Sequence, residues 1–348
     1  STARKAILPV MAAAGGMLAP ALIYLAFNHG TPAAHGWGIP TATDIAFAIG
    51  ILSLMGDRVP VSLKIFLTAL AVVDDLGAIL VIAIFYGGAV KWGFLFLALA
   101  IMAGLYGLNR LGETRISYFL IPAFVVWGLF YYSGIHATLS GVAMAMIIPM
   151  RPRYSKPYFF RQLRNFTRSL ERVREEDERF PDAEQRYYYL QRMKDLSYNS
   201  IGMSYRLEDL LAPYVTFIIM PIFALANAGV RIDLEYLDIF RYSSEGGAVG
   251  IGIFLGLLVG KPLGILLTSW AAVKSGFAEM PGGVSWRMLL AVACLGGIGF
   301  TMSIFVDALA FDEEFFVNQG KIAILLGSLA SALLGALLIR VTMPAVKN

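Results

Sequence analysis

The stretch 69–86, ALAVVDDLGAILVIAIFY, decides how the rest of the chain is interpreted. It is apolar enough to cross a bilayer as a helix, yet it carries Asp74 and Asp75 near its middle. On an insertion scale its Leu, Ile, Val and Phe residues contribute about −3 to −6 kcal/mol, and two central acids take back about 5 to 7 kcal/mol. Because these contributions nearly cancel, we predict that the two carboxylates have a function.

The composition indicates an integral membrane protein. Hydrophobic residues make up 58% of the chain, charged residues only 15%, and the mean hydropathy is +0.68. A soluble domain usually has about 25% charged residues. The net charge of +4 is too small to suggest a nucleic-acid partner. Cys294 is the single cysteine, which excludes an internal disulfide, and three histidines leave little for a zinc centre, so no cofactor is predicted.

Apolar segments predict an all-α bundle with ten transmembrane helices. Several segments are short, which suggests tilt, interruption or burial inside the bundle. The predicted spans are 6–27, 39–55, 61–86, 92–108, 116–132, 135–149, 213–228, 248–273, 288–310 and 321–340.

The basic residues predict that both ends of this chain face the cytoplasm. The stretch 150–209 has little sustained hydrophobicity and is predicted to be a cytoplasmic helical insertion, solvated or involved in regulation. It divides the membrane domain into a first part, 1–149, and a second part, 210–348. Outside the insertion, the inner segments hold Arg4, Lys5, Arg58, Arg110, Arg115, Lys274, Arg287, Arg340 and Lys347, and the outer ones hold Lys91, Arg231, Arg241 and Lys321.

The first three and last three predicted spans form triplets that cross the membrane in opposite directions. The middle member of each is interrupted, by GIPTATDIAFAIG (38–50) in one and by CLGGIGFTMSIF (294–305) in the other. Interrupted spans at matching positions of two inverted halves indicate a transporter binding site near the middle of the membrane.

Asp74 and Asp75 lie about 100° apart around a helix, close enough to line one cavity. Desolvation and mutual repulsion disfavour charging both, so we expect their proton binding to be coupled. Such a pair can hold protons or, once deprotonated, a hard cation. The alternative, that they cap a helix or are paired only structurally, is weakened by the apolar residues on both sides.

Two further residues qualify as part of an ion site. Asp44 follows Thr41 and Thr43 where Pro40 weakens the helix, and it could balance the positive dipole ends of half-helices or serve only structural neutralisation. Lys261 is the one basic residue deep in a span. A buried ammonium needs a partner, and we expect an intramembrane aspartate, within the ion site or as a structural salt bridge.

Asp307 and His136 are ambiguous. Asp307 lies close to the acidic residues Asp312, Glu313 and Glu314 at the outer side. His136 stands at the entrance of a span, where a hydrogen-bonded packing histidine is the commoner case.

In order along the chain, the motifs ATDIAFAIG, ALAVVDDLGAI, HATLSGV, PIFALANAGV, LLVGKPLGI and GGIGFTMSIF closely resemble those of the NhaA sodium/proton antiporters. The resemblance covers nearly everything except about 150–205. It implies an inverted-repeat bundle with two interrupted, crossing helices. NhaA-type antiporters are among the proteins behind the rule on interrupted repeats, so the internal symmetry adds no independent support.

The resemblance implies electrogenic exchange of sodium or lithium for protons by alternating access, with activity rising at alkaline pH, in a bacterial inner membrane. Asp75 is implied as the firmer sodium ligand and Asp74 as a carrier that may exchange its partner for Lys261. Thr43 and Asp44 match the interrupted helix beside the site.

The resemblance also has departures. Glu208 and His136 match positions linked to pH response, but family histidines fall here at Asp209 and Ala212. Asp307 stands where an uncharged residue is common. Aligned on the motifs, the chain begins near the third of twelve expected helices, and the preceding region is expected to support a homodimer.

Two other function classes share some of these sequence features. A sodium-coupled organic-anion symporter of related fold is the nearest alternative, although paired carboxylates and Lys261 fit cation/proton exchange better. An intramembrane aspartyl protease also needs two aspartates, but its GxGD signature is absent from the sequence.

Overall fold

The computed structural model describes residues 2–87, 90–176, 183–227, 229, 239–240 and 247–343. All elements within these ranges are helices, which confirms the predicted all-α class. The chain divides into two compact units, 1–86 with 221–348, and 87–220. This division differs from the expected parts 1–149, 150–209 and 210–348, which remain a prediction.

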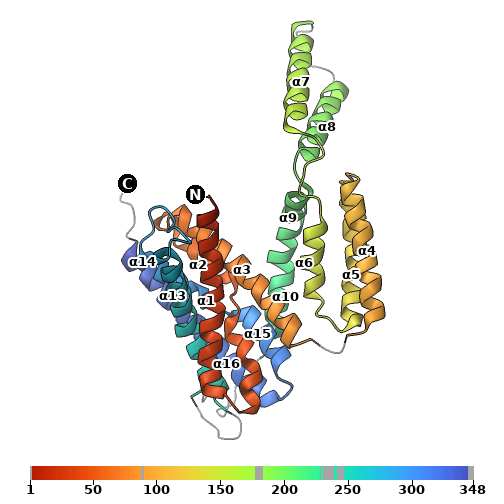
Figure 1. Ribbon diagram of the computed structural model, residues 1–348. Helices are drawn as coiled ribbons and strands as arrows, with labels where there is room; N and C mark the ends of the chain where they lie inside the picture. The colour runs from red at the N-terminus through yellow and green to blue at the C-terminus, as the bar shows by residue number, and fades with distance from the viewer. Residues whose placement is uncertain are drawn as a thin grey trace. The chain divides into compact units, whose positions relative to one another are not determined.

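The first unit contains two sets of helices that are far apart in the sequence (Figure 1). Its amino-terminal set is α1 (Thr2–Asn28), η1 (Pro32–Thr41), α2 (Ile45–Leu54), η2 (Gly56–Arg58) and α3 (Val61–Phe85). Its carboxy-terminal set is α12 (Val249–Leu255), η4 (Gly256–Gly260), α13 (Lys261–Lys274), α14 (Trp286–Gly296), α15 (Phe300–Ala310) and α16 (Glu314–Thr342).

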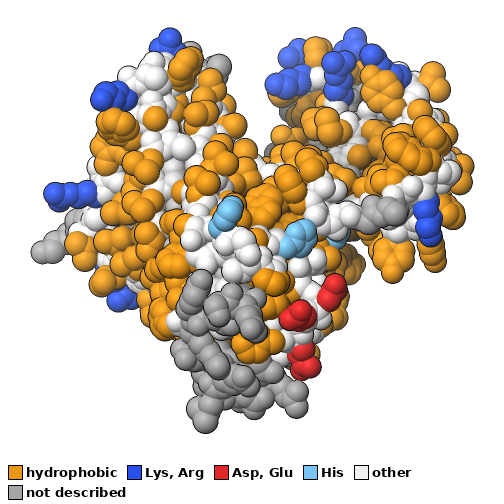
Figure 2. Space-filling model, turned by 60° about the horizontal axis from the view of Figure 1, so that its bottom comes forward, with side chains coloured by type: hydrophobic (Ala, Val, Ile, Leu, Met, Phe, Trp, Pro, Cys, Tyr) orange, Lys and Arg blue, Asp and Glu red, His pale blue; other side chains and the backbone are white. Residues whose placement is uncertain are grey.

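Seven of the described helices are long and apolar enough to cross a membrane, or eight if the bent pair α14 and α15 is one span. Hydrophobic side chains also cover much of the surface (Figure 2). The chain is therefore a multi-pass membrane protein. The predicted count of ten spans is not confirmed, because the helices at two predicted spans, Ser117–Ser133 and Thr138–Ile147, have only 17 and 10 residues.

Helix α16 shows the side-chain pattern expected in lipid. Leu326, Leu329 and Leu333 are exposed along one side, whereas Ser328 and Ser331 are buried. A soluble helix would place these residue types the other way round. In a bilayer, Leu can face the acyl chains while small polar residues pack between helices. The face of α16 that carries Ser328 and Ser331 is therefore the one turned toward the other helices.

Small residues let α1 and α13 pack side by side. A Cβ atom at Gly264 of α13 would overlap the backbone of Gly15 in α1, and a Cβ at Gly260 would lie 2.7 Å from the Cα of Pro20. Close backbone approach of this kind is the main source of helix association where no hydrophobic driving force acts between helices. It joins the two sets of helices in this unit.

The middle span of each triplet is broken, as predicted. In the amino-terminal set the chain leaves η1 at Thr41 and re-enters a helix at Ile45. In the carboxy-terminal set α14 ends at Gly296 and α15 begins at Phe300, with a bend of 47° between them. Helix α1 begins at one end of the unit, and helix α16 finishes at that same end (Figure 1). The side of the membrane on which this end lies remains a prediction. Three of the basic residues used for it, Arg231, Arg241 and Lys347, lie outside the described residues.

The second unit contains the predicted insertion as two helices, α7 and α8, that pack against each other. Arg206, which is buried, donates from its guanidinium to the carbonyl of Thr114 at 3.0 Å and stacks over the ring of Tyr198 at 4.1 Å. It thereby ties α9 to the end of α8 and to the α4–α5 loop. The helices of this unit are α4 (Trp92–Arg110), α5 (Ser117–Ser133), α6 (Thr138–Ile147), α7 (Lys156–Glu176), α8 (Ala183–Asn199), α9 (Met203–Tyr214) and η3 (Val215–Ile219), and α10 (Met220–Asn227) follows at the boundary.

Candidate ion-binding site

Three side chains meet in the interior of the first unit, Asp74 from α3, Lys261 from α13 and Thr43 from the break between η1 and α2. The ammonium of Lys261 donates to Oδ2 of Asp74, and it also donates to Oγ1 of Thr43 at 2.6 Å. The residues are 1% to 3% exposed. Burial of this ammonium and this carboxylate is tolerable only because they are paired and hydrogen-bonded. The expected partner of Lys261 is thus an intramembrane aspartate, and it is Asp74.

Thr43 links this pair to the second broken helix. Its hydroxyl lies 2.5 Å from Oδ2 of Asp74 and 2.9 Å from the carbonyl oxygen of Gly296. A hydroxyl has one proton to donate, so it can serve only one of these two acceptors while it accepts from Lys261. The Thr43 hydroxyl can therefore change its hydrogen-bond partners when the charge on Asp74 changes.

The segment that positions Lys261 is irregular. Residues Gly256–Gly260 form one turn of π-helix directly before Lys261, and Pro262 follows it. A π-turn shifts the side chains that follow it around the helix axis, and such turns are frequent at functional sites. Pro262 lacks an N–H, which is tolerated in a first helical turn. The local sequence GLLVGKP thus sets the direction in which Lys261 points.

Asp75 lies next to the pair but outside it. Its side chain is partly buried, and it is within electrostatic range of Asp74, Lys261 and Asp44. Its Oδ1 is buried without a hydrogen-bond partner, and so is Oδ1 of Asp74. Asp74 and Asp75 therefore each have one buried carboxylate oxygen that is unsatisfied and open to a proton or a cation.

Asp44 caps two helices at once. Its Oδ1 accepts from the backbone N–H of Phe47 at 3.3 Å, which caps α2. Its Oδ2 accepts from the backbone N–H of Thr301 at 3.1 Å and from the Thr301 hydroxyl, at the first turn of α15. A helix N-terminus carries a partial positive charge, so one buried carboxylate balances two dipole ends.

The two breaks are also joined by backbone. The N–H of Asp44 donates to the carbonyl of Ile298 at 2.6 Å. Ser328 of α16 accepts from the N–H groups of Gly299 and Phe300 at 3.2 and 3.0 Å. Sequence reasoning did not single out Thr301 or Ser328. The only local signal for these two residues was the interruption GGIGFTMS. It shows that backbone N–H groups lose their helical acceptors there, but not which side chains accept from them instead.

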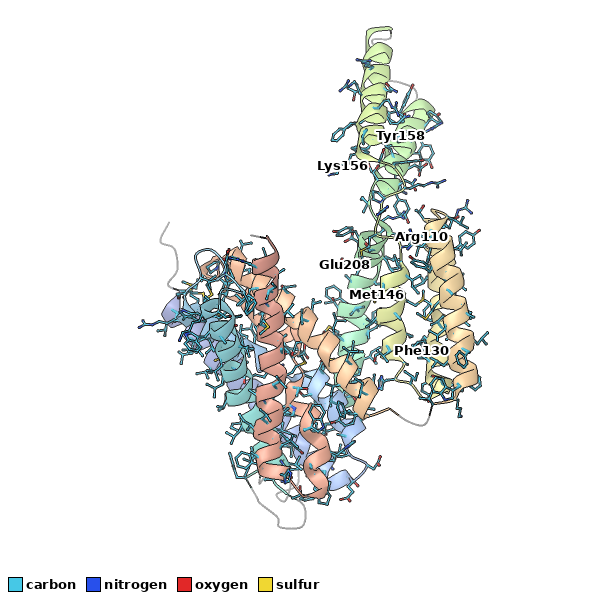
Figure 3. All side chains as sticks on the ribbon, viewed as in Figure 1. Arg110, Phe130, Met146, Lys156, Tyr158 and Glu208 are labelled. Carbon is cyan, nitrogen blue, oxygen red and sulfur yellow. The ribbon has the colours of Figure 1, made fainter. Side chains whose placement is uncertain are left out.

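The two residues linked to pH response belong to the second unit. Glu208 is exposed on α9 (Figure 3). His136 is half-buried before α6, with its Nδ1 3.0 Å from the hydroxyl of Thr138. Burial lowers the pKa of His136 below its usual value. The sequence predictions for Glu208 and His136 therefore remain predictions, separate from the geometry of the first unit.

Buried ionisable groups that meet where two broken helices touch are typical of ion-coupled transporters, for which NhaA-type antiporters are themselves among the standard examples. Within the described residues, no cluster of three His, Cys, Asp or Glu side chains forms a resident metal site.

Comparison with known proteins identifies the family. The family model described as Na+/H+ antiporter 1 matches residues 1–339, so the chain belongs to this family. Relatives named Na(+)/H(+) antiporter NhaA include one from Oleidesulfovibrio alaskensis, 44% identical over 97% of this chain and 74% of its own length. Others are from Cytophaga hutchinsonii, at 43% over 99% and 76%, and Bordetella parapertussis, at 44% over 98% and 75%.

These matches confirm the resemblance drawn from the sequence motifs. They give no support to the alternative of an organic-anion symporter.

Proposed function

We propose that this chain exchanges sodium ions for protons across a membrane and that Asp74 and Asp75 carry both. One observation supports this most strongly. Beside a buried Lys261 ammonium, each of the two neighbouring carboxylates has a buried oxygen with no hydrogen-bond partner. Hard cations prefer oxygen ligands, and a proton needs only one of them.

Protons and sodium ions compete for these carboxylates because of the charge balance at the site. With Lys261 protonated and Asp74 ionised, the pair is neutral, and a charge on Asp75 would be left uncompensated. A proton on Asp75 removes that charge, and so does a sodium ion held between the two acids. Sodium also attracts Asp74 away from Lys261. The same oxygens therefore serve one cargo or the other, which couples the two movements.

The broken helices supply the means for alternating access. Asp44 and Thr43 hold both breaks together through side-chain and backbone hydrogen bonds, and these can rearrange without unfolding a continuous helix. We propose secondary active transport, not enzymatic catalysis, driven by inward proton movement that expels sodium or lithium. More protons than sodium ions move in each cycle, so transport is electrogenic.

The relatives are bacterial proteins, and we propose that this chain acts in a bacterial inner membrane, contributing to pH homeostasis and salt tolerance. A homodimer is part of the proposal on the condition that the protein includes the family's amino-terminal helices. The orientation with both ends of the chain in the cytoplasm is part of the same proposal.

The proposal is tested in proteoliposomes that contain the full chain. Sodium or lithium addition should collapse a preset pH gradient, and Asp75→Asn should abolish this response. Asp312→Asn, which removes an exposed carboxylate, should leave it intact. Sodium-dependent proton movement that persists in Asp75→Asn would refute the role of Asp75. A response to membrane potential that is unchanged in Asp74→Asn would count against Asp74 as a carrier.

A further inference from the structure

Asp307 in α15 is a buried acid that the exchange site does not use. Its side chain is 0% exposed, and both of its carboxylate oxygens lack a hydrogen-bond partner. A buried polar group without a partner is costly, and a buried unpaired charge is far more costly. The carboxyl of Asp307 therefore has to be neutralised by something bound to it.

Two described helices and two ionisable side chains surround Asp307. Helix α15 packs against η1 and α16. On α16 the carboxyl lies directly against Gly320, where a Cβ atom would overlap it. The ionisable groups within electrostatic range are Tyr24 of α1 and Lys321 of α16. Tyr24 donates its hydroxyl proton to the carbonyl of Ala33, and Lys321 donates to the carbonyl of Gly229. Neither group is a hydrogen-bond partner of the Asp307 carboxyl.

These neighbours favour a proton over a cation at Asp307. A hard cation needs several oxygen ligands, and Asp307 belongs to no cluster of acidic side chains among the described residues. A proton needs a single oxygen and removes the charge completely. We propose that Asp307 is a second proton-binding site of this protein, separate from the Asp74 and Asp75 pair, and that it is occupied in this conformation.

The position of Asp307 indicates where its proton is exchanged. It lies six residues after Thr301, the contact of Asp44, which places it about 9 Å further along α15. Just beyond the end of α15, Asp312, Glu313 and Glu314 are exposed at the turn into α16. Acidic side chains also gather in one place on the face shown in Figure 2. Exposed carboxylates attract protons to this turn, which places a source of protons at the end of the helix that carries Asp307.

The inference is independent of sodium exchange and is tested without transport. Infrared spectra of the purified full chain are recorded at neutral pH for the natural protein and for Asp307→Asn, whose amide replaces a neutral carboxyl with little change in shape. The natural protein should show the carbonyl stretch of a protonated carboxyl that Asp307→Asn lacks. Titration should release about one proton fewer per chain from the variant above neutral pH. Asp312→Asn should change neither measurement.

A second variant keeps the test decisive if Asp307→Asn does not fold. Gly320→Ala pushes a methyl group into the carboxyl and should shift the same infrared band, whereas Gly104→Ala, where a Cβ meets nothing within 4 Å, should not. Identical spectra in the carboxyl region for the natural protein and Asp307→Asn would overturn the proposal. A band unmoved by Gly320→Ala would also overturn it, because the band would then come from another acid.

Discussion

The ammonium of Lys261 and the carboxylate of Asp74 form a hydrogen-bonded ion pair in the interior of the first unit, 187 residues apart in the sequence. Each is intolerable there without the other, because an uncompensated charge in a low-dielectric interior is strongly destabilising. The pair therefore contributes to structure and to ion binding at once. Because the pair has both roles, single substitutions alone cannot separate its contribution to stability from its contribution to ion binding.

A double-mutant comparison can separate them. Lys261→Ala should lower the free energy of unfolding by about 3 to 5 kcal/mol, because it leaves Asp74 charged and unpaired. Adding Asp74→Asn should restore a large part of that loss without restoring exchange. Thermal unfolding in detergent of Lys261→Ala, Asp74→Asn and the double variant measures the coupling. Additive effects of the two substitutions would show that the pair does not exist in the protein.

Asp44 gives a test of the double cap. Asp44→Ala removes the acceptor for Phe47 and Thr301 together, and each lost cap costs about 0.5 to 2 kcal/mol. Ser285→Ala is the matched control, since Ser285 caps α14 alone by accepting from Met288 at 3.3 Å. We expect the Asp44 variant to lose at least twice as much stability in thermal unfolding. Equal losses would mean that Asp44 does not stabilise both helices.

The interrupted span at Thr41 to Asp44 could be predicted, because Pro40 and small polar residues weaken a helix locally. The need of Lys261 for an acidic partner could be predicted as well, since burial alone imposes it. The motifs, not the spacing, suggested that this partner is Asp74. Local physics thus identified most charged members of the site.

Partners from distant segments could not be predicted. Thr301 and Ser328 satisfy the broken ends of helices, but serine and threonine are common in membrane helices and nothing in one sequence marks which of them accept these bonds. The predicted count of ten spans is not confirmed for a related reason. Hydropathy cannot distinguish a full crossing from a shorter apolar helix such as Thr138–Ile147.

His136 should affect the pH dependence of exchange only on its acidic side. Burial lowers the pKa of this histidine, so the imidazole is neutral at every pH above its ordinary value of about 6.5. Any stability that the neutral form contributes is present above that pH and is lost as the pH falls. His136→Gln should therefore leave the rise in activity at alkaline pH in place. An alkaline rise displaced by a full pH unit would contradict this.

Packing of α1 on α13 should be sensitive to size at a single position. Gly264→Ala places a methyl group against the backbone of Gly15, and we expect a loss of about 1 to 3 kcal/mol in stability. Gly128→Ala, in α5 of the second unit where a Cβ meets nothing within 4 Å, should cost nothing measurable. Similar unfolding temperatures for both variants would rule out close α1–α13 contact.

The central claim is that sodium and protons compete for the oxygens of Asp74 and Asp75. Isothermal titration calorimetry of the purified protein, in buffers that differ in ionisation enthalpy, counts the protons released for each sodium ion bound. We predict that sodium binding releases protons and that Asp75→Asn abolishes both events. Sodium binding with no proton release at any pH would contradict the account.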